Sequence, residues 1–123
     1  MVTGGARGIG RAIVEDLCAD HDLATTYLSS NPSALPPDVC AIKADLSVPQ
    51  SHGQVIAEVI KRFGRLDIIV NNAGAIAVSP LEEFDADAGR HLLDVNLLAP
   101  HGLLAAALPH LAEGACVVSI SSV

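Results

Sequence analysis

Apolar and polar positions fall into blocks along the chain, and the blocks change between helical and extended spacing. Apolar residues recur every three or four positions from Ile9 to Leu17 and from Val55 to Phe63, which is the spacing of one helical face. Short, nearly continuous apolar runs lie at residues 23–28, 39–44, 66–70 and 115–120. Runs of this kind are typical of strands that are covered on both faces.

Turn-forming residues mark where these elements begin and end. The triplet DHD at residues 20–22 ends the first helix, and three prolines within residues 29–38 predict a loop with at most one helical turn. Pro49 suits the start of the second helix, and Gly64 suits its C-terminal stop.

A long helix is predicted to begin in the acidic segment 82–87 and to run to about Leu111. Acidic side chains at a helix start favour the positive end of the helix dipole. Pro100 predicts a kink. The uncharged run 95–112 contains an asparagine, two prolines and two histidines, so it predicts a buried helix rather than a membrane span.

The element order is β-α-β-(loop)-β-α-β-α-β, with the first strand reduced to residues 1–3. This alternation predicts an α/β fold, a doubly wound parallel sheet with right-handed crossovers. The expected architecture is Rossmann-like, with three α/β/α layers.

Composition narrows the possible partners. The chain has 123 residues, of which 50% are hydrophobic, so it forms at most one domain with an aliphatic core. A net charge of −7 argues against a nucleic-acid partner. The histidines have no metal-ligand spacing, and no metal is predicted. Three separated cysteines and the lack of a signal-peptide pattern predict a cytoplasmic protein with reduced thiols.

Glycines cluster at the first strand-to-helix turn, at Gly4, Gly8 and Gly10. Backbone amides at a helix N-terminus bind anions, and glycine lets a phosphate approach closely. The spacing differs from G-x-G-x-x-G, so the turn by itself fits either a phosphate site or a tight turn without a ligand.

Five motifs, in order along the chain, resemble those of the short-chain dehydrogenase/reductase family. Residues 3–10 (TGGARGIG) are similar to its T-G-x-x-x-G-[IL]-G turn, and residues 45–46 (DL) to the D-[VL] pair after its third strand. Residues 71–74 (NNAG) resemble its N-N-A-G motif. Asn96 resembles the asparagine of its long helix, and residues 119–122 (SISS) the strand end that carries its catalytic serine.

The resemblance implies an NAD(P)(H)-dependent oxidoreductase that interconverts a carbonyl and an alcohol of a small molecule by hydride transfer. The glycines would line the pyrophosphate, residues 45–46 would border the adenine, and residues 72–74 would follow the adenosine and ribose. For Asn71, a role in tying adjacent strands and a cofactor role remain equally open. The implied cofactor-binding residues are Thr3, Gly4, Arg7, Gly8, Ile9, Gly10, Asp45, Leu46, Asn72, Ala73 and Gly74.

The implied catalytic residues are Ser122 and Asn96. Ser122 would hydrogen-bond the substrate oxygen, and Asn96 would help hold the water chain of a proton relay. The alternatives are a serine that merely ends a strand and an asparagine on an exposed face. The family's acid/base tyrosine lies in a downstream Y-x-x-x-K motif, in which the lysine lowers a phenol pKa that is ordinarily near 10. Tyr27, the only tyrosine here, does not match it.

Residues 1–123 are therefore expected to be an incomplete, C-terminally truncated NAD(P)-binding domain. Two alternatives to an active reductase are a catalytically inactive fragment that binds nucleotides or a partner subunit, and an unrelated doubly wound nucleotide binder. The family packs its long helix between subunits, which implies a homo-oligomer through the helix around residues 88–111. An uncovered strand at 115–120 favours self-association.

The strand end at Leu28 bears on the choice of nicotinamide cofactor. NAD preference usually needs a carboxylate there, and the next acid along the chain is Asp38. Arg7 could meet a 2′-phosphate, with Ser29 and Ser30 as further hydrogen-bond donors, and a guanidinium suits phosphate well. The sequence thus favours NADP(H) over NAD(H), although Leu28 departs from the arginine often found in NADP-dependent members.

Overall fold

The computed structural model describes residues 1–121, so the predicted catalytic Ser122 lies outside the described residues. The helices are α1 (Gly8–Leu17), α2 (Pro49–Phe63), α3 (Ala86–Leu93) and α4 (Ala99–Ala107), and the strands are β1 (Ala24–Tyr27), β2 (Cys40–Lys43), β3 (Leu66–Asn71) and β4 (Leu111–Ser119). The loop between β1 and β2 contains a single 3-10 turn, Pro32–Ala34, as its prolines predicted.

Residues 1–3 join two parallel strand pairs, β1–β2 and β3–β4, into one sheet. Val2 forms parallel bridges to Thr25 of β1 and to Val70 of β3. Its N–H donates to the Ala24 carbonyl at 2.9 Å. The short first strand is therefore central, and the order across the sheet is β2, β1, residues 1–3, β3, β4.

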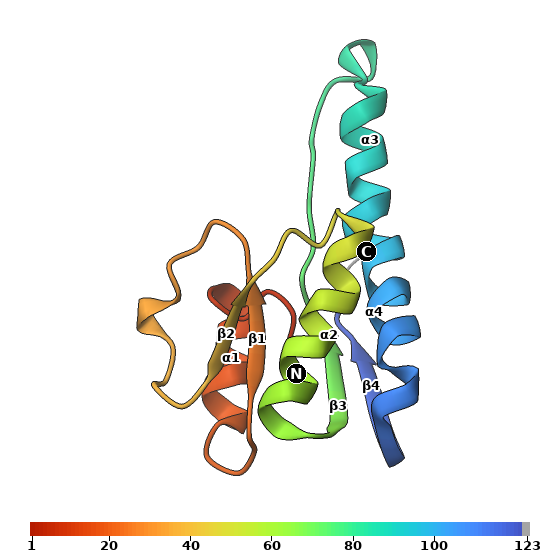
Figure 1. Ribbon diagram of the computed structural model, residues 1–123. Helices are drawn as coiled ribbons and strands as arrows, with labels where there is room; N and C mark the ends of the chain where they lie inside the picture. The colour runs from red at the N-terminus through yellow and green to blue at the C-terminus, as the bar shows by residue number, and fades with distance from the viewer. Residues whose placement is uncertain (122–123) are drawn as a thin grey trace.

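Helices cover both faces of this sheet, with α2 and α4 side by side on one of them (Figure 1). Successive residues of a strand point to opposite faces. In β3, Ile69 accordingly packs in the cluster formed with α2 and α4, whereas Val70 packs with Val14 of α1. The predicted three-layer α/β/α arrangement with a parallel sheet is confirmed.

Helix α2 follows its sequence signals closely. It begins at Pro49 and buries Val55, Ile56 and Val59 along one face. Gly64 ends it in the left-handed conformation, with φ +75, and donates its N–H to the Ile60 carbonyl at 2.7 Å. A glycine is favoured at this position because it has no Cβ to strain.

The predicted single helix from the acidic segment to Leu111 is wrong in its details. The chain forms α3, a π-helical turn at Asp94–Leu98, and then α4. The irregularity lies just before the predicted kink at Pro100, which sits in the first turn of α4, where its missing N–H is tolerated. Helix α4 ends at Ala107, and a 3-10 turn at Leu108–His110 leads directly into β4.

The expected burial of this helical region is also wrong. Helix α4 buries only Ala99, Leu103 and Ala107. Its neighbours Leu97 and Leu98 are 61% and 53% exposed. Taken together, α3, the π-turn, α4 and the 3-10 turn form a continuous helical stretch, Ala86–His110. Within residues 1–121 it is the one stretch that is long and apolar enough to cross a membrane, a criterion that core helices of soluble proteins also meet.

Strand β4 starts four residues earlier than the predicted 115–120. Leu111 pairs with Leu66, and Cys116 then pairs with Ile68, so the intervening residues form a bulge that contains Gly114 at φ +79. Within residues 1–121, β3 is the only strand that pairs with β4. The outer edge of β4 therefore presents unpaired backbone groups, a geometry that favours pairing with another strand.

Two glycines of one helix test how the backbone of α2 is stabilised. Gly64→Ala is expected to destabilise the chain by about 1 kcal/mol, because alanine is strained at positive φ. Gly53→Ala is expected to stabilise it by about 0.5–1 kcal/mol, because Gly53 is helical and a Cβ there meets no atom within 4 Å. Urea unfolding followed by circular dichroism measures both. Shifts in the same direction for the two variants would contradict this account.

Candidate functional site

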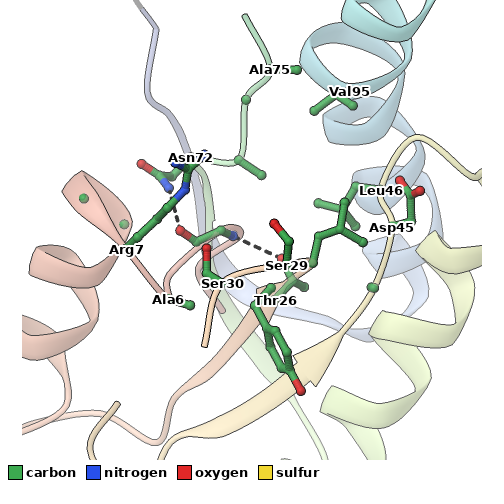
Figure 2. A pocket seen from close by; sticks show the side chains of 18 of the residues that line it. Ala6, Arg7, Thr26, Ser29, Ser30, Asp45, Leu46, Asn72, Ala75 and Val95 are labelled. Carbon is green, nitrogen blue, oxygen red and sulfur yellow. Dashed lines mark hydrogen bonds between the residues drawn. The ribbon is translucent and has the colours of Figure 1, made fainter. Parts of the chain in front are cut away.

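A cavity of about 500 Å³ opens at the carboxyl ends of the central strands (Figure 2). Ligands of parallel α/β sheets bind in this position. Its walls come from the glycine turn, from the ends of β1 and β2, from the segment after β3 and from α3 with the π-turn. The lining residues include Gly4, Arg7, Gly8, Ile9, Gly10, Ser29, Ser30, Asp45, Leu46, Asn72, Ala73 and Gly74.

The three predicted glycines have different structural reasons. Gly4 has φ +67, and a Cβ there would lie 3.0 Å from the Ala73 Cα. A Cβ on Gly10 would collide with the Asn72 side chain. Gly8 has φ +55, and a Cβ there would meet no atom within 4 Å, because this residue faces the open cavity at the start of α1. Gly4 and Gly10 therefore allow close packing, and Gly8 keeps the helix start accessible.

The N-terminus of α1 is not capped by its own side chains. The N-cap residue is Arg7, which makes no side-chain hydrogen bond to the first turn. The first amides of a helix need partners and carry partial positive charge. Because the cavity reaches Arg7, Gly8 and Ile9, the uncapped amides and one guanidinium adjoin the same space.

Thr3 and Asn72 hold the glycine turn against the segment after β3. The Thr3 hydroxyl oxygen accepts from the N–H groups of Asn72 and Ala73, both at 2.9 Å. The Asn72 side-chain amide donates to the Thr3 carbonyl at 2.9 Å and to the Gly4 carbonyl at 3.3 Å. Thr3 is 2% exposed and lies behind the cavity wall. It therefore holds the glycine turn in position and does not itself face the cavity.

Two threonines of β1 fix the other side of the turn, and sequence reasoning did not single them out. The Gly4 N–H donates to the Thr26 hydroxyl at 3.1 Å, and the Gly5 N–H donates to the Thr25 hydroxyl at 2.9 Å. Thr25 in turn donates to the Val2 carbonyl at 2.7 Å. Two adjacent threonines inside an otherwise apolar strand could have indicated this role, because buried hydroxyl groups need hydrogen-bond partners.

The turn after β2 contains a carboxylate at the cavity wall. Asp45 Oδ1 accepts from the Ser47 hydroxyl at 2.7 Å and from the Ser47 N–H at 2.9 Å. These bonds, first the hydroxyl and then the backbone N–H, hold the pKa of Asp45 below its ordinary value. Asp45 is therefore an anion at neutral pH, and the buried Leu46 follows it in the same wall.

Asn96 lies in the π-turn and pairs twice with the segment after β3. Its Oδ1 accepts from the Ala75 N–H at 2.8 Å, and its Nδ2 donates to the Ala75 carbonyl at 2.9 Å. Asn96 is exposed and does not line the cavity, whereas Val95 and His91 from the same helical region do. Neither was predicted, although they stand four residues apart on a helix that faces the site.

Most of the predicted site residues lie together around the cavity. Every predicted cofactor-binding residue except Thr3 lines the cavity, and Ser122 lies outside the described residues. Asn71, for which two roles were open, donates its Nδ2 to the Ser119 hydroxyl at 3.4 Å and so connects β3 to β4. Among residues 1–121, no three His, Cys, Asp or Glu side chains are grouped to hold a metal ion.

Known proteins with similar sequences include oxidoreductases. L-fucose dehydrogenase of Bos taurus is 38% identical over 132 residues, which covers 99% of this chain and 48% of that protein. An uncharacterized oxidoreductase of Methylorubrum extorquens is 33% identical over 133 residues, covering 100% of this chain and 54% of the relative. The chain spans about half the length of the curated relatives it matches.

Solved structures reproduce the fold. A blue fluorescent protein from a metagenomic library, in complex with NADPH, superposes with a TM-score of 0.90 at 34% identity, covering 98% of this chain and 54% of that one. A short chain dehydrogenase from Burkholderia cenocepacia, in complex with NADP, has a TM-score of 0.89 at 38% identity, with the same coverage. The profile of the family described as short chain dehydrogenase matches residues 1–123, and the chain therefore belongs to the short-chain dehydrogenase/reductase family.

Proposed function

We propose that the cavity binds NADP(H) for hydride transfer between a small-molecule carbonyl and an alcohol. The observation that carries this proposal is the uncapped start of α1, which opens through Gly8 onto the cavity. A pyrophosphate suits that space, because it can accept from the free amides of the first helical turn. Any side chain larger than glycine at position 8 would enter the same space.

The remaining walls suit the other parts of a dinucleotide. In Figure 2, Arg7 and Asn72 lie at one end of the cavity, and Asp45 and Leu46 at the other. The ionised Asp45 can accept from the exocyclic amine of an adenine. The segment 72–74, held by Thr3, would follow the adenosine and ribose.

The end of β1 supports the preference for NADP(H). Leu28, Ser29 and Ser30 line the cavity there, together with Arg7. None of these residues carries the carboxylate that would bind a ribose 2′-hydroxyl and repel a 2′-phosphate. Arg7 instead supplies a cation for a 2′-phosphate, and the two serines supply hydroxyl donors.

Of the two proposed catalytic residues, Asn96 is not among the residues that line the cavity, and Ser122 lies outside the described residues. When bound, the nicotinamide supplies or accepts the hydride, and Ser122 would hydrogen-bond the substrate oxygen. Asn96 would help to hold a water chain, because Pro100 has no N–H and the regular helical bond to the Asn96 carbonyl cannot form. No residue among these 123 matches the family's Tyr-x-x-x-Lys motif, so the proposal assigns no acid/base residue.

We also propose that the protein self-associates through the apolar face of α3 and α4 and resides in the cytoplasm. Leu93, Leu97 and Leu98 are each more than half exposed in this region. An apolar patch of this kind marks an interaction surface. The second copy of the chain offers an equally apolar partner face.

Two arginines near the start of α1 test the cofactor assignment. Arg7→Ala is expected to weaken NADPH binding by roughly 10-fold or more and to leave NADH binding nearly unchanged, because a charge-assisted bond to the 2′-phosphate is lost. Arg11→Ala is the control, since Arg11 pairs with Glu15 at 2.7 Å and does not line the cavity. Dissociation constants come from nicotinamide fluorescence. Equal losses for NADPH and NADH in Arg7→Ala would overturn the preference.

The helical face is tested by charge. Leu97→Glu is expected to lower the average mass of the chain in solution, because a carboxylate opposes its burial between copies. Val48→Glu introduces the same charge at a 43% exposed position outside α3 and α4 and is expected to leave the mass unchanged. Light scattering at matched concentrations measures both. A wild-type chain that remains monomeric would contradict self-association.

A further inference from the structure

His52 is a buried titratable residue for which the proposed function has no role. It lies in the first turns of α2 and is only 7% exposed. Its side chain does not line the cavity. It is nevertheless in contact with the cavity wall on one side and with α4 on the other, and each contact constrains the ring.

The first contact is a hydrogen bond to the turn after β2. His52 Nε2 lies 2.9 Å from the Leu46 carbonyl oxygen. A carbonyl can only accept, so the proton of this bond resides on Nε2. Leu46 stands between Asp45, whose carboxylate lines the cavity, and Ser47, which donates to that carboxylate. The Asp45–Ser47 pair and the Val48 N–H, which donates to the Asp45 carbonyl at 3.2 Å, close this turn on itself. The bond from His52 adds a contact from α2 to the middle of the turn.

The second contact is with the backbone of α4. A Cβ on Gly102 would come within 2.8 Å of His52 Cε1 and 3.1 Å of Cγ, and closer still to Nδ1. Real Cβ atoms essentially never approach another heavy atom within 3.0 Å, so the ring fills the space that a side chain at position 102 would take. His52 and Gly102 have complementary volumes, and the ring is clamped between α4 and the Leu46 carbonyl.

From these two contacts we propose that His52 is a positioning residue for the adenine end of the nucleotide site, an inference that rests on the proposed function. The ring transmits the position of α4 to the Asp45–Ser47 turn. Helix α4 continues directly from the π-turn that carries Val95 of the cavity wall and Asn96. One imidazole thereby holds two separate walls of the site in register.

Three variants separate the hydrogen bond from the packing. His52→Gln retains an amide N–H near the position of Nε2, and His52→Val removes the donor. The double variant His52→Val with Gly102→Ala refills much of the vacated volume without restoring the donor. Gly53→Ala, one residue away on the exposed side of α2, is the matched control.

Binding of NADPH and of ADP, which carries only the adenine half, is measured together with thermal stability. His52→Val is expected to weaken both ligands by the same factor of about 3–10, the value of one neutral hydrogen bond. His52→Gln is expected to remain within about twofold of wild type. In the double variant the melting temperature should recover while both affinities stay low, because packing alone does not orient the Leu46 carbonyl.

The alternative outcomes are distinct. If affinity recovers with stability in the double variant, or if His52→Gln binds as poorly as His52→Val, His52 is only a packing residue and the proposal is overturned. If the wild-type chain binds neither NADPH nor ADP, the proposed function fails. Hydrogen exchange then still measures the turn without ligand: faster exchange of the Ser47 N–H in His52→Val, but not in Gly53→Ala, supports positioning, and unchanged exchange excludes it.

Discussion

The hydrogen bonds of residues 1–3 are the constraint on which the rest of the structure depends. Val2 bridges β1 on one side and β3 on the other, and without it the described strands form two separate pairs. The same strand continues through Thr3 into the glycine turn. The position of the turn relative to β1 and β3 is thus set by the pairing that also closes the sheet. Residues 1–3 therefore both join the two strand pairs and position the glycine turn of the site.

Neutral hydrogen bonds from two segments, β1 and the end of β3, hold the glycine turn at the cavity wall. Thr25 and Thr26 hold the turn from β1, and Asn72 holds it from the end of β3. All of these groups are buried or half-buried, where an unpaired donor or acceptor is costly. The turn is therefore formed before any ligand binds, and a nucleotide would meet amides that are already oriented. His52 extends the same principle to the turn after β2.

The region of α3 and α4 is where the hydrophobic pattern predicted the structure least well. The uncharged run 95–112 predicted a buried helix, yet Leu97 and Leu98 are largely exposed, and the helical region is divided by a π-turn. An apolar pattern predicts that a helix face is more stable when it is covered, but it does not identify the surface that covers it. The division itself was hidden, because Pro100 fits both a kinked helix and a helix that starts anew after a π-turn.

The sequence by itself determined the element order and the bounds of α2, because helical spacing, prolines and glycines act within a few residues of themselves. The family motifs added the grouping of segments that lie far apart in the chain. Only the tertiary structure decided that Thr3 stands behind the wall, that Thr25 and Thr26 hold the turn, and that His52 fits against Gly102. Those roles arise from hydrogen bonds and complementary volumes between residues about 20 to 70 positions apart, and no local pattern encodes which of many buried polar groups will meet.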